Sequence, residues 1–249
     1  MSVLYKYLDM EAALRSIHDG TLKFVEPSEW KDQYEKRFYD ADYSQITKSD
    51  KRTNNNPRLL ASCFTRTKND ESAPLLYCYG KSGLGSICVR VQLSISGIRN
   101  ELDSYAKKND LMVYEGPVDY SMSETQLNTL HKRLKEDGEE NPYYKEYFSS
   151  FTLDSYLSLL LLKRPLFRHE MEHRFFLIPK NKDAINDKSC FVPFAWPQVV
   201  KNITIMKGHS EFEHELLRQV CDKAGLKAEI MEMDLYNNPD DQITIDANQ

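Results

Sequence analysis

The chain has 249 residues, of which 41% are hydrophobic and 29% charged, a composition typical of a soluble globular protein rather than a disordered or fibrous one. Its 33 basic and 38 acidic residues give a net charge of -5, which excludes binding to nucleic acid through overall charge and leaves only a local basic groove for such contacts. The five cysteines lack C-x-x-C spacing, which argues against a zinc ribbon or a disulfide framework and favours buried thiols in a reducing cytosol.

No segment of the sequence has the pattern of a secretory signal or a membrane span. The N-terminal residues lack the long apolar stretch of a signal peptide. The longest apolar run, at residues 156–162, is far too short to cross a bilayer. We therefore expect a cytoplasmic protein without membrane contact, folded as one domain over residues 1–249.

The first part of the chain alternates short apolar runs with turn and helix signals. Strands are expected at residues 4–8, 22–25, 59–65, 75–79 and 86–93. Asp9 is placed to cap a helix that Gly20 would end, and residues 26–35 are expected to form a loop. The glycine-containing residues 80–85 predict a turn.

The middle of the chain carries helical patterns, and the C-terminal third returns to alternating strands and helices. Ser123 and Ser210 each begin a capping box and predict a helix, and the leucine-rich residues 152–163 predict another. The helix after Ser210 is expected to bury Phe212, Leu216 and Val220. The remaining strands are expected at residues 203–206, 227–233 and 242–246. This order of elements predicts a mixed α+β domain.

The sequence R-H-E-M-E-H, which ends at His173, has two incompatible interpretations. In a helix, His169, Glu170 and His173 would form the H-E-x-x-H motif, in which two imidazoles one turn apart bind zinc. In a strand, side chains alternate, so Glu170, Glu172 and Arg174 would share one face. The local backbone therefore decides which chemistry is available.

The flanking residues favour the strand. Residues 175–178 form a short aromatic and aliphatic run that Pro179 closes, as in a fully buried strand. The zinc interpretation lacks a clear third ligand, because His209 and His214 lie in or near a different expected helix. We keep the zinc hydrolase as the alternative.

Several short motifs, taken in order, resemble a group of bacterial proteins, the domain-of-unknown-function 2971 family. They are L-Y-K-Y at residues 4–7, L-A-S-C-F at 60–64, L-L-Y-C-Y at 75–79, the segment 163–174, and I-T-I-M at 203–206. Tyr77 stands where the family usually has tryptophan, and Phe167 lies near its other tryptophan. Asp32 and Glu35 of the family's acidic loop motif are retained.

The order of these motifs also resembles that of ADP-ribosyltransferases, especially toxins that modify nucleic acid or translation components. The resemblance implies a mixed split β-sheet with flanking helices, NAD as co-substrate and no metal. It implies that Glu172 and Glu170 are catalytic. The residues that it implies for NAD binding are Lys6, Tyr7, Ser62, Thr65 and Tyr79. Lys6 stands where those enzymes usually have arginine or histidine.

The implied chemistry has a physical basis in paired carboxylates. Cleavage of the nicotinamide–ribose bond of NAD passes through a cation at the ribose carbon, which a carboxylate facing it stabilises. Glu172 would take this role, and Glu170 would orient or deprotonate the acceptor. The rival interpretation is a salt-bridged ladder of Glu170, Glu172 and Arg174 on a solvated face. In that case Lys6 would be an ordinary surface lysine.

The first hypothesis is thus an NAD-dependent ADP-ribosyltransferase that modifies a macromolecule (RNA, DNA or protein) as a toxin or antiviral-defence effector. An antitoxin or a chaperone would be the expected partner of such a toxin. Two alternatives stay open: the zinc hydrolase, and a non-catalytic sensor or partner-binding module of a defence system.

Overall fold

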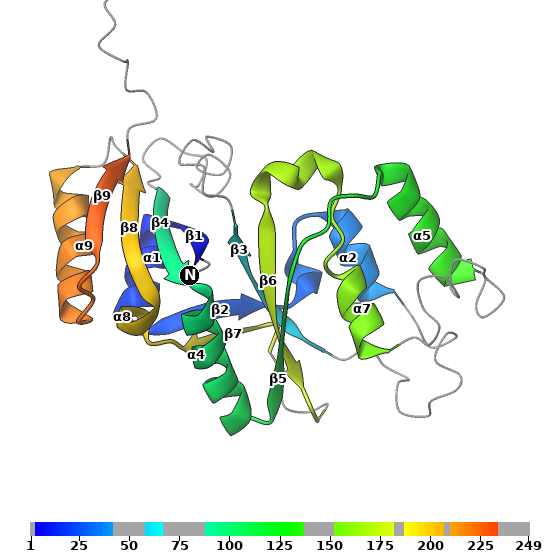
Figure 1. The fold of residues 1–249 in the computed structure, drawn as a ribbon, viewed down its shortest axis with the longest axis horizontal. Coiled ribbons are helices and arrows are strands. Elements are labelled where there is room, and N and C mark those ends of the chain that lie inside the picture. Colours follow the sequence, from blue (N-terminus) through cyan, green and yellow to red (C-terminus); the bar gives the residue numbers. More distant parts are fainter. Residues whose placement is uncertain are drawn as a thin grey trace, which may run out of the picture.

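The computed structural model describes residues 3–41, 58–66, 88–136, 152–181, 187–206 and 210–233. The expected strands at residues 75–79 and 242–246, the turn at residues 80–85 and Tyr79 lie outside these ranges. The described residues form an α+β structure in which helices flank a mixed β-sheet, as expected (Figure 1). Of the helices described, none combines the length and the hydropathy that a membrane span requires.

The sheet follows the order β5-β6-β3-β1-β4-β8-β9, and β2 and β7 branch from β3. Its described strands are β1 (Val3–Asp9), β2 (Thr21–Val25), β3 (Leu60–Thr65), β4 (Cys88–Ser94), β5 (Leu111–Pro117), β6 (Glu172–Pro179), β7 (Ser189–Pro193), β8 (Val200–Met206) and β9 (Glu229–Met233). The pair β8–β9 is parallel and the other described pairs are antiparallel, so the sheet is mixed.

One edge of β3 is shared by two strands, and the sheet splits there. β1 meets this edge where Tyr5 lies opposite Thr65, whereas β2 meets it where Val25 lies opposite Ala61. The other edge of β3 pairs with β6 along its whole length. Figure 1 shows β2 and β7 turned across the direction of β4 and β8. The split sheet expected from the sequence is therefore present.

Helices cover the sheet at several places. They are α1 (Met10–His18), α2 (Gln33–Asp40), α4 (Ile95–Lys108), α5 (Glu124–Glu136), α7 (Leu153–Leu159), α8 (Trp196–Val199) and α9 (Glu211–Lys223), with short 3-10 helices η1 (Pro27–Glu29) and η3 (Pro165–Glu170). In Figure 1, α9 lies beside β8 and β9 at one end of the molecule, and α2, α5 and α7 gather beside β5 and β6 at the other.

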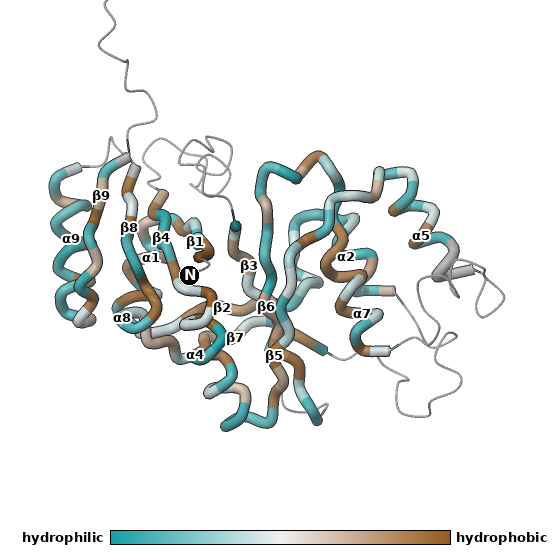
Figure 2. The backbone as a smooth tube through the Cα atoms, viewed as in Figure 1, coloured by the Kyte–Doolittle hydropathy of each residue, from teal (hydrophilic) through white to brown (hydrophobic). Residues whose placement is uncertain are grey.

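Two apolar clusters lie on opposite faces of β6. Phe175 and Leu177 belong to the larger cluster, and Phe176 and Ile178 belong to the cluster under α2, α5 and α7. Successive side chains of a strand point to opposite faces, so a strand buried on both sides needs an unbroken apolar run. Figure 2 shows β6 changing from hydrophilic at its start to hydrophobic further along. The polar start of β6 is where the candidate site lies.

Helix caps expected from the sequence are present. The Asp9 carboxylate accepts a hydrogen bond from the Ala12 amide at 2.8 Å, and Gly20 follows α1 with a φ of 61°, in the region that favours glycine. Ser210 forms a capping box at the start of α9, in which the Glu213 amide donates to its hydroxyl. These local signals fix where α1 and α9 begin.

Other expectations are wrong or incomplete. The loop expected at residues 26–35 contains η1 and the start of α2, and α7 is shorter than residues 152–163. The buried face of α9 carries Leu217 and Cys221, whereas Phe212 is 73% exposed. Because successive helical residues are rotated by about 100°, this correction corresponds to turning the helix by roughly one residue.

Candidate active site

The two glutamates of the E-x-E sequence do not lie on one strand. Glu170 ends the 3-10 helix η3, Met171 adopts a left-handed conformation with φ 44° and ψ 43°, and β6 begins only at Glu172. The expectation of alternating acids on a strand is therefore wrong for Glu170. The kink at Met171 is held by the Arg66 amide, which donates to the Met171 carbonyl at 2.9 Å.

The kink nevertheless brings both carboxylates to one cation, Lys163. Its Nζ lies 2.6 Å from Glu170 Oε2 and 2.5 Å from Glu172 Oε1. A third carboxylate, that of Glu35 on α2, lies 3.1 Å away through Oε1. All four side chains are buried, so these contacts lie in a medium of low polarity, where charges interact strongly.

Arg174 is the second cation of this cluster and is 1% exposed. Its Nε donates to Glu172 Oε2 at 2.7 Å, one terminal nitrogen donates to the Leu160 carbonyl at 2.6 Å, and the other donates to the Glu35 carboxylate. The guanidinium also stacks 4.3 Å from the ring of Trp30. The solvated ladder considered from the sequence is therefore wrong, because these charges form a buried network.

The environment separates the proton affinities of the two acids. Burial and a hydrogen bond with Glu172 raise the pKa of Glu170 to about 8. Burial alone would also raise the pKa of Glu172, but the Arg174 charge, the hydrogen bond from Glu170 and Lys163 outweigh it and lower the pKa. The pair thus shares one proton near neutral pH, and the raised pKa of Glu170 and the lowered pKa of Glu172 favour its place on Glu170.

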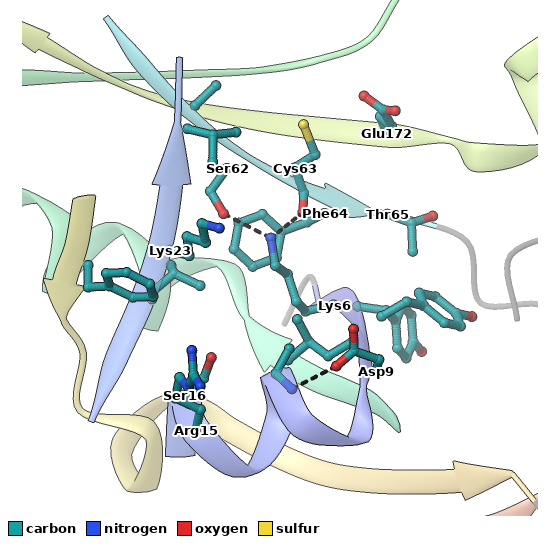
Figure 3. Close-up of a pocket in the computed structure, with 18 of the residues that line it drawn as sticks. Lys6, Asp9, Arg15, Ser16, Lys23, Ser62, Cys63, Phe64, Thr65 and Glu172 are labelled. Carbon is teal, nitrogen blue, oxygen red and sulfur yellow. Dashed lines mark hydrogen bonds between the residues drawn. The ribbon is translucent and has the colours of Figure 1, made fainter. Parts of the chain in front are cut away.

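A cavity of about 500 Å³ opens in the split between β1 and β2, within the range of small-molecule sites. It is lined by residues of β1, α1, β2 and β3 and by Glu170, Glu172 and Phe191. Figure 3 shows Glu172 at one side of this cavity and Lys6 near its middle. Both acids therefore belong to the lining of a cavity that is partly open to solvent.

Lys6 crosses the cavity from β1 to β3. Its Nζ donates to Ser62 Oγ at 2.9 Å and to the Cys63 carbonyl at 2.8 Å, and it lies 4.7 Å from the centre of the Phe64 ring. Burial lowers the pKa of Lys6 to about 8, since Cys63 and Glu172 only partly offset the lost hydration. Burial also raises the pKa of the Cys63 thiol to about 12, which argues against a thiolate nucleophile here.

The residues proposed from the sequence largely meet at this cavity. Those that line it are Lys6, Tyr7, Ser62, Thr65, Glu170 and Glu172. The Thr65 hydroxyl donates to the Glu170 carbonyl at 2.5 Å and so braces the kink. The predicted role of Tyr79 stays a prediction, because that residue lies outside the described ranges.

The sequence indicated no role for Lys163, and it placed Arg174 beside the acids only in a solvated ladder. It left Glu35 either in a substrate-facing loop or with a local capping or bridging role. Their signal was weak: Lys163 and Arg174 border apolar runs, and Glu35 lies in a stretch rich in charged and aromatic residues. Asp32, considered together with Glu35, caps α2 by accepting from the Tyr34 amide at 2.9 Å and pairs with Arg164 at 3.2 Å. Asp32 thus orients the helix that carries Glu35.

The helical zinc motif is not formed. His169 lies exposed on η3, and His173 lies on β6 with its Nε2 3.1 Å from Glu115 Oε2. Across the described residues, no group of His, Cys, Asp and Glu is arranged to hold a metal ion. The zinc hydrolase alternative therefore loses the geometry on which it depended.

Comparison with solved structures adds a distant similarity. Neither a family model nor a curated protein matches the chain, so its likeness to the domain-of-unknown-function 2971 family depends on the short motifs alone. Among solved structures, DarT of Thermus sp. 2.9 in complex with ADP-ribosylated single-stranded DNA aligns with a TM-score of 0.39 and 9% identity. The alignment covers 93% of this chain and 94% of that one.

Proposed function

We propose that this protein is an NAD-dependent ADP-ribosyltransferase whose reaction takes place in the split-sheet cavity. The observation that carries the proposal is the position of Glu172: a buried, ionised carboxylate, held by two cations, in the lining of a cavity that also contains Lys6. A fixed negative charge in such surroundings stabilises a developing cation more strongly than the same charge in water.

In the proposed reaction, the bond between the nicotinamide nitrogen and the ribose carbon breaks, and nicotinamide leaves with the electron pair. The resulting ribosyl cation faces the Glu172 carboxylate. A nucleophile of the acceptor then forms the new bond to the same carbon, and its proton passes to the ionised form of Glu170. With a pKa of about 8, Glu170 is matched to proton transfer near neutral pH.

The neighbouring residues have supporting roles in this proposal. Lys163 and Arg174 position Glu172 and keep it charged. Lys6, as the cation in the middle of the cavity, would contact the NAD diphosphate. Tyr7, Ser62 and Thr65, together with Tyr79, remain the proposed NAD-binding residues. The acceptor is proposed to be RNA, DNA or protein, and a toxin or defence role with an antitoxin or chaperone partner belongs to the same proposal.

The test is to incubate the purified protein with labelled NAD and a mixture of RNA, DNA and protein acceptors. Wild-type protein is expected to consume NAD and label one acceptor class. Glu172→Gln keeps the shape of the side chain but loses the charge, and we expect a rate loss of about 10²–10³-fold. Glu215→Gln, an exposed acid on α9, is the matched control. A folded wild-type protein that neither consumes NAD nor labels any acceptor would refute the proposal.

A non-catalytic binding module is the second candidate, favoured by the complete pairing of Glu172 inside a buried network that would also serve a structural purpose. The two candidates differ in what Glu172→Gln does in cells. A binding module keeps its cellular effect after this change, whereas a transferase loses it although the protein remains folded.

A further inference from the structure

The side of the cavity remote from the acid pair carries an aromatic ring and two cations. Phe191 on β7 and Lys23 on β2 are directly opposite each other in the strand register, and Lys23 Nζ lies 5.8 Å from the centre of the Phe191 ring. Both residues line the cavity, as does Arg15 of α1. In Figure 3, Lys23 and Arg15 lie on the side of the cavity away from Glu172, and Lys6 lies between that side and Glu172.

The exposure of Phe191 is not explained by packing. Its side chain is 50% exposed, while the next residue, Val192, is fully buried on the opposite face of β7. Among the described strands β7 pairs with β2 alone, so Phe191 lies on an edge strand at the mouth of the cavity. A half-exposed ring at the entrance of a pocket provides a flat apolar surface for a planar ligand group.

The two cations are available to an anion. Lys23 is exposed and forms no ion pair within the part of the chain that the structure describes. Arg15 pairs with Glu11 at 3.4 Å, but their side chains are 62% and 70% exposed. Ion pairs with that exposure contribute little, so Arg15 can exchange Glu11 for a phosphate at small cost.

We infer that this end of the cavity binds the adenosine phosphate part of the dinucleotide, with the adenine ring stacked on Phe191 and phosphate oxygens contacting Lys23 and Arg15. The inference rests on the proposed function and adds the orientation of NAD: adenosine lies at the Phe191 end, and the nicotinamide ribose lies at Glu172. Lys6, between the two ends, then meets the diphosphate.

The test is calorimetric binding of three ligands to the full chain: AMP, ADP-ribose and nicotinamide mononucleotide. Phe191→Ala is expected to lower the affinity for AMP and for ADP-ribose by at least about tenfold, which is the scale of base–aromatic stacking. The affinity for nicotinamide mononucleotide should change by less than about twofold. Phe191→Tyr keeps the ring and should keep the affinity. Phe212→Ala removes a ring that is 73% exposed, on α9 and outside the cavity lining, and is the control.

Four outcomes would overturn the inference: no AMP binding by the wild type, no loss with Phe191→Ala, an equal loss for all three ligands, or unchanged ADP-ribose affinity with reduced transfer to an acceptor. The last would assign Phe191 to the acceptor. The proposed function fails separately. If AMP binding depends on Phe191 but the protein consumes no NAD, the subsite stands and the transferase is refuted. If the protein consumes NAD but Phe191→Ala leaves all three ligand affinities unchanged, the transferase stands and the subsite is refuted.

Discussion

Glu170 and Glu172 show how one pair of identical side chains acquires two protonation states. The Glu172 carboxylate accepts hydrogen bonds from both Arg174 and Lys163, whereas Glu170 accepts one from Lys163 alone and lies against the Glu172 carboxylate. Two carboxylates in contact cannot both ionise easily, so the less well compensated one keeps the proton. A neutral acid beside an ionised one is the arrangement that general acid–base chemistry requires.

This difference predicts a pH dependence of the transfer rate. If the ionised form of Glu170 accepts the acceptor's proton, the rate at saturating NAD should rise with pH and level off above about 8, because the active form accumulates as the proton leaves. Glu170→Gln should lower the rate by about 10²–10⁴-fold and remove the rise. Initial rates over a pH series measure both. A wild-type rate that is flat with pH, or a rise that persists in Glu170→Gln, contradicts the role.

Lys6 illustrates a different residue-scale feature, a cation retained where its charge is disfavoured. Burial lowers the pKa of Lys6 from 10.5 to about 8, so the buried charge opposes folding fully below about pH 8 and by a decreasing amount from there to pH 10.5. Two hydrogen bonds and the Phe64 ring compensate only in part. A cavity cation that is poorly hydrated gains more from an anionic ligand than a surface lysine would, which agrees with its proposed place at the diphosphate.

At the scale of elements, the decisive feature is the junction of η3 and β6. Met171 is one of two non-glycine residues with positive φ among the described residues, and its conformation turns Glu170 back towards Lys163. For an L-residue this conformation costs about 1–2 kcal/mol. Strain of this size persists where the surroundings hold it, here the Arg66 amide and the Thr65 hydroxyl.

The junction gives a prediction for Met171. Met171→Gly should change the free energy of unfolding by no more than about 1 kcal/mol, because glycine adopts positive φ freely but loosens the unfolded chain. Met171→Val should lower it by at least about 1–2 kcal/mol, because a β-branched residue tolerates this conformation poorly. Urea denaturation measures the difference.

Met112 provides the control for this prediction. It is 38% exposed, close to the 37% of Met171, but lies in the extended strand β5. Met112→Val should therefore leave stability nearly unchanged, since β-branched residues suit strands. If valine lowered the free energy of unfolding equally at the two positions, backbone strain at Met171 would not be the cause of the loss.

Elements with strong local signals could be predicted from the sequence, and those defined by distant partners could not. The apolar run of β6 and the cap at Ser210 needed only neighbouring residues. α2 was not predicted because its buried side chains are Phe38 and a charged residue, Glu35. The partner of Glu35, Arg174, is 139 positions away in the sequence. No hydrophobic period marks a helix that buries a carboxylate.

The same reason limits prediction of the site. The E-x-E sequence and the family-like segments pointed to Glu170, Glu172 and Lys6, which do line one cavity. Their geometry depended on the left-handed Met171 and on Lys163, and neither has a sequence signature. Propensity describes the backbone near a residue, whereas an ion network depends on which elements the fold brings together.

At the scale of the whole molecule, the buried network connects elements from distant parts of the chain. Glu35 comes from α2, Lys163 follows α7, and Arg174 lies on β6, which separates the two apolar clusters. Such a network contributes to stability only as a complete set, because the attraction of its charges offsets the cost of removing them from water. Loss of one member leaves the others uncompensated.

Arg174 tests this interdependence and separates it from catalysis. Arg174→Met leaves the Glu35 and Glu172 carboxylates buried with Lys163 alone, and should lower the free energy of unfolding by about 3–5 kcal/mol. Adding Glu35→Gln and Glu172→Gln removes those charges and should restore much of the loss, as measured by urea denaturation. The triple variant should still fail to consume NAD, because it lacks the charge that faces the ribosyl cation. If the triple variant regained both stability and turnover, Glu172 would have no part in the chemistry. If Arg174→Met alone were as stable as the wild type, the network would not be what holds α2 against β6.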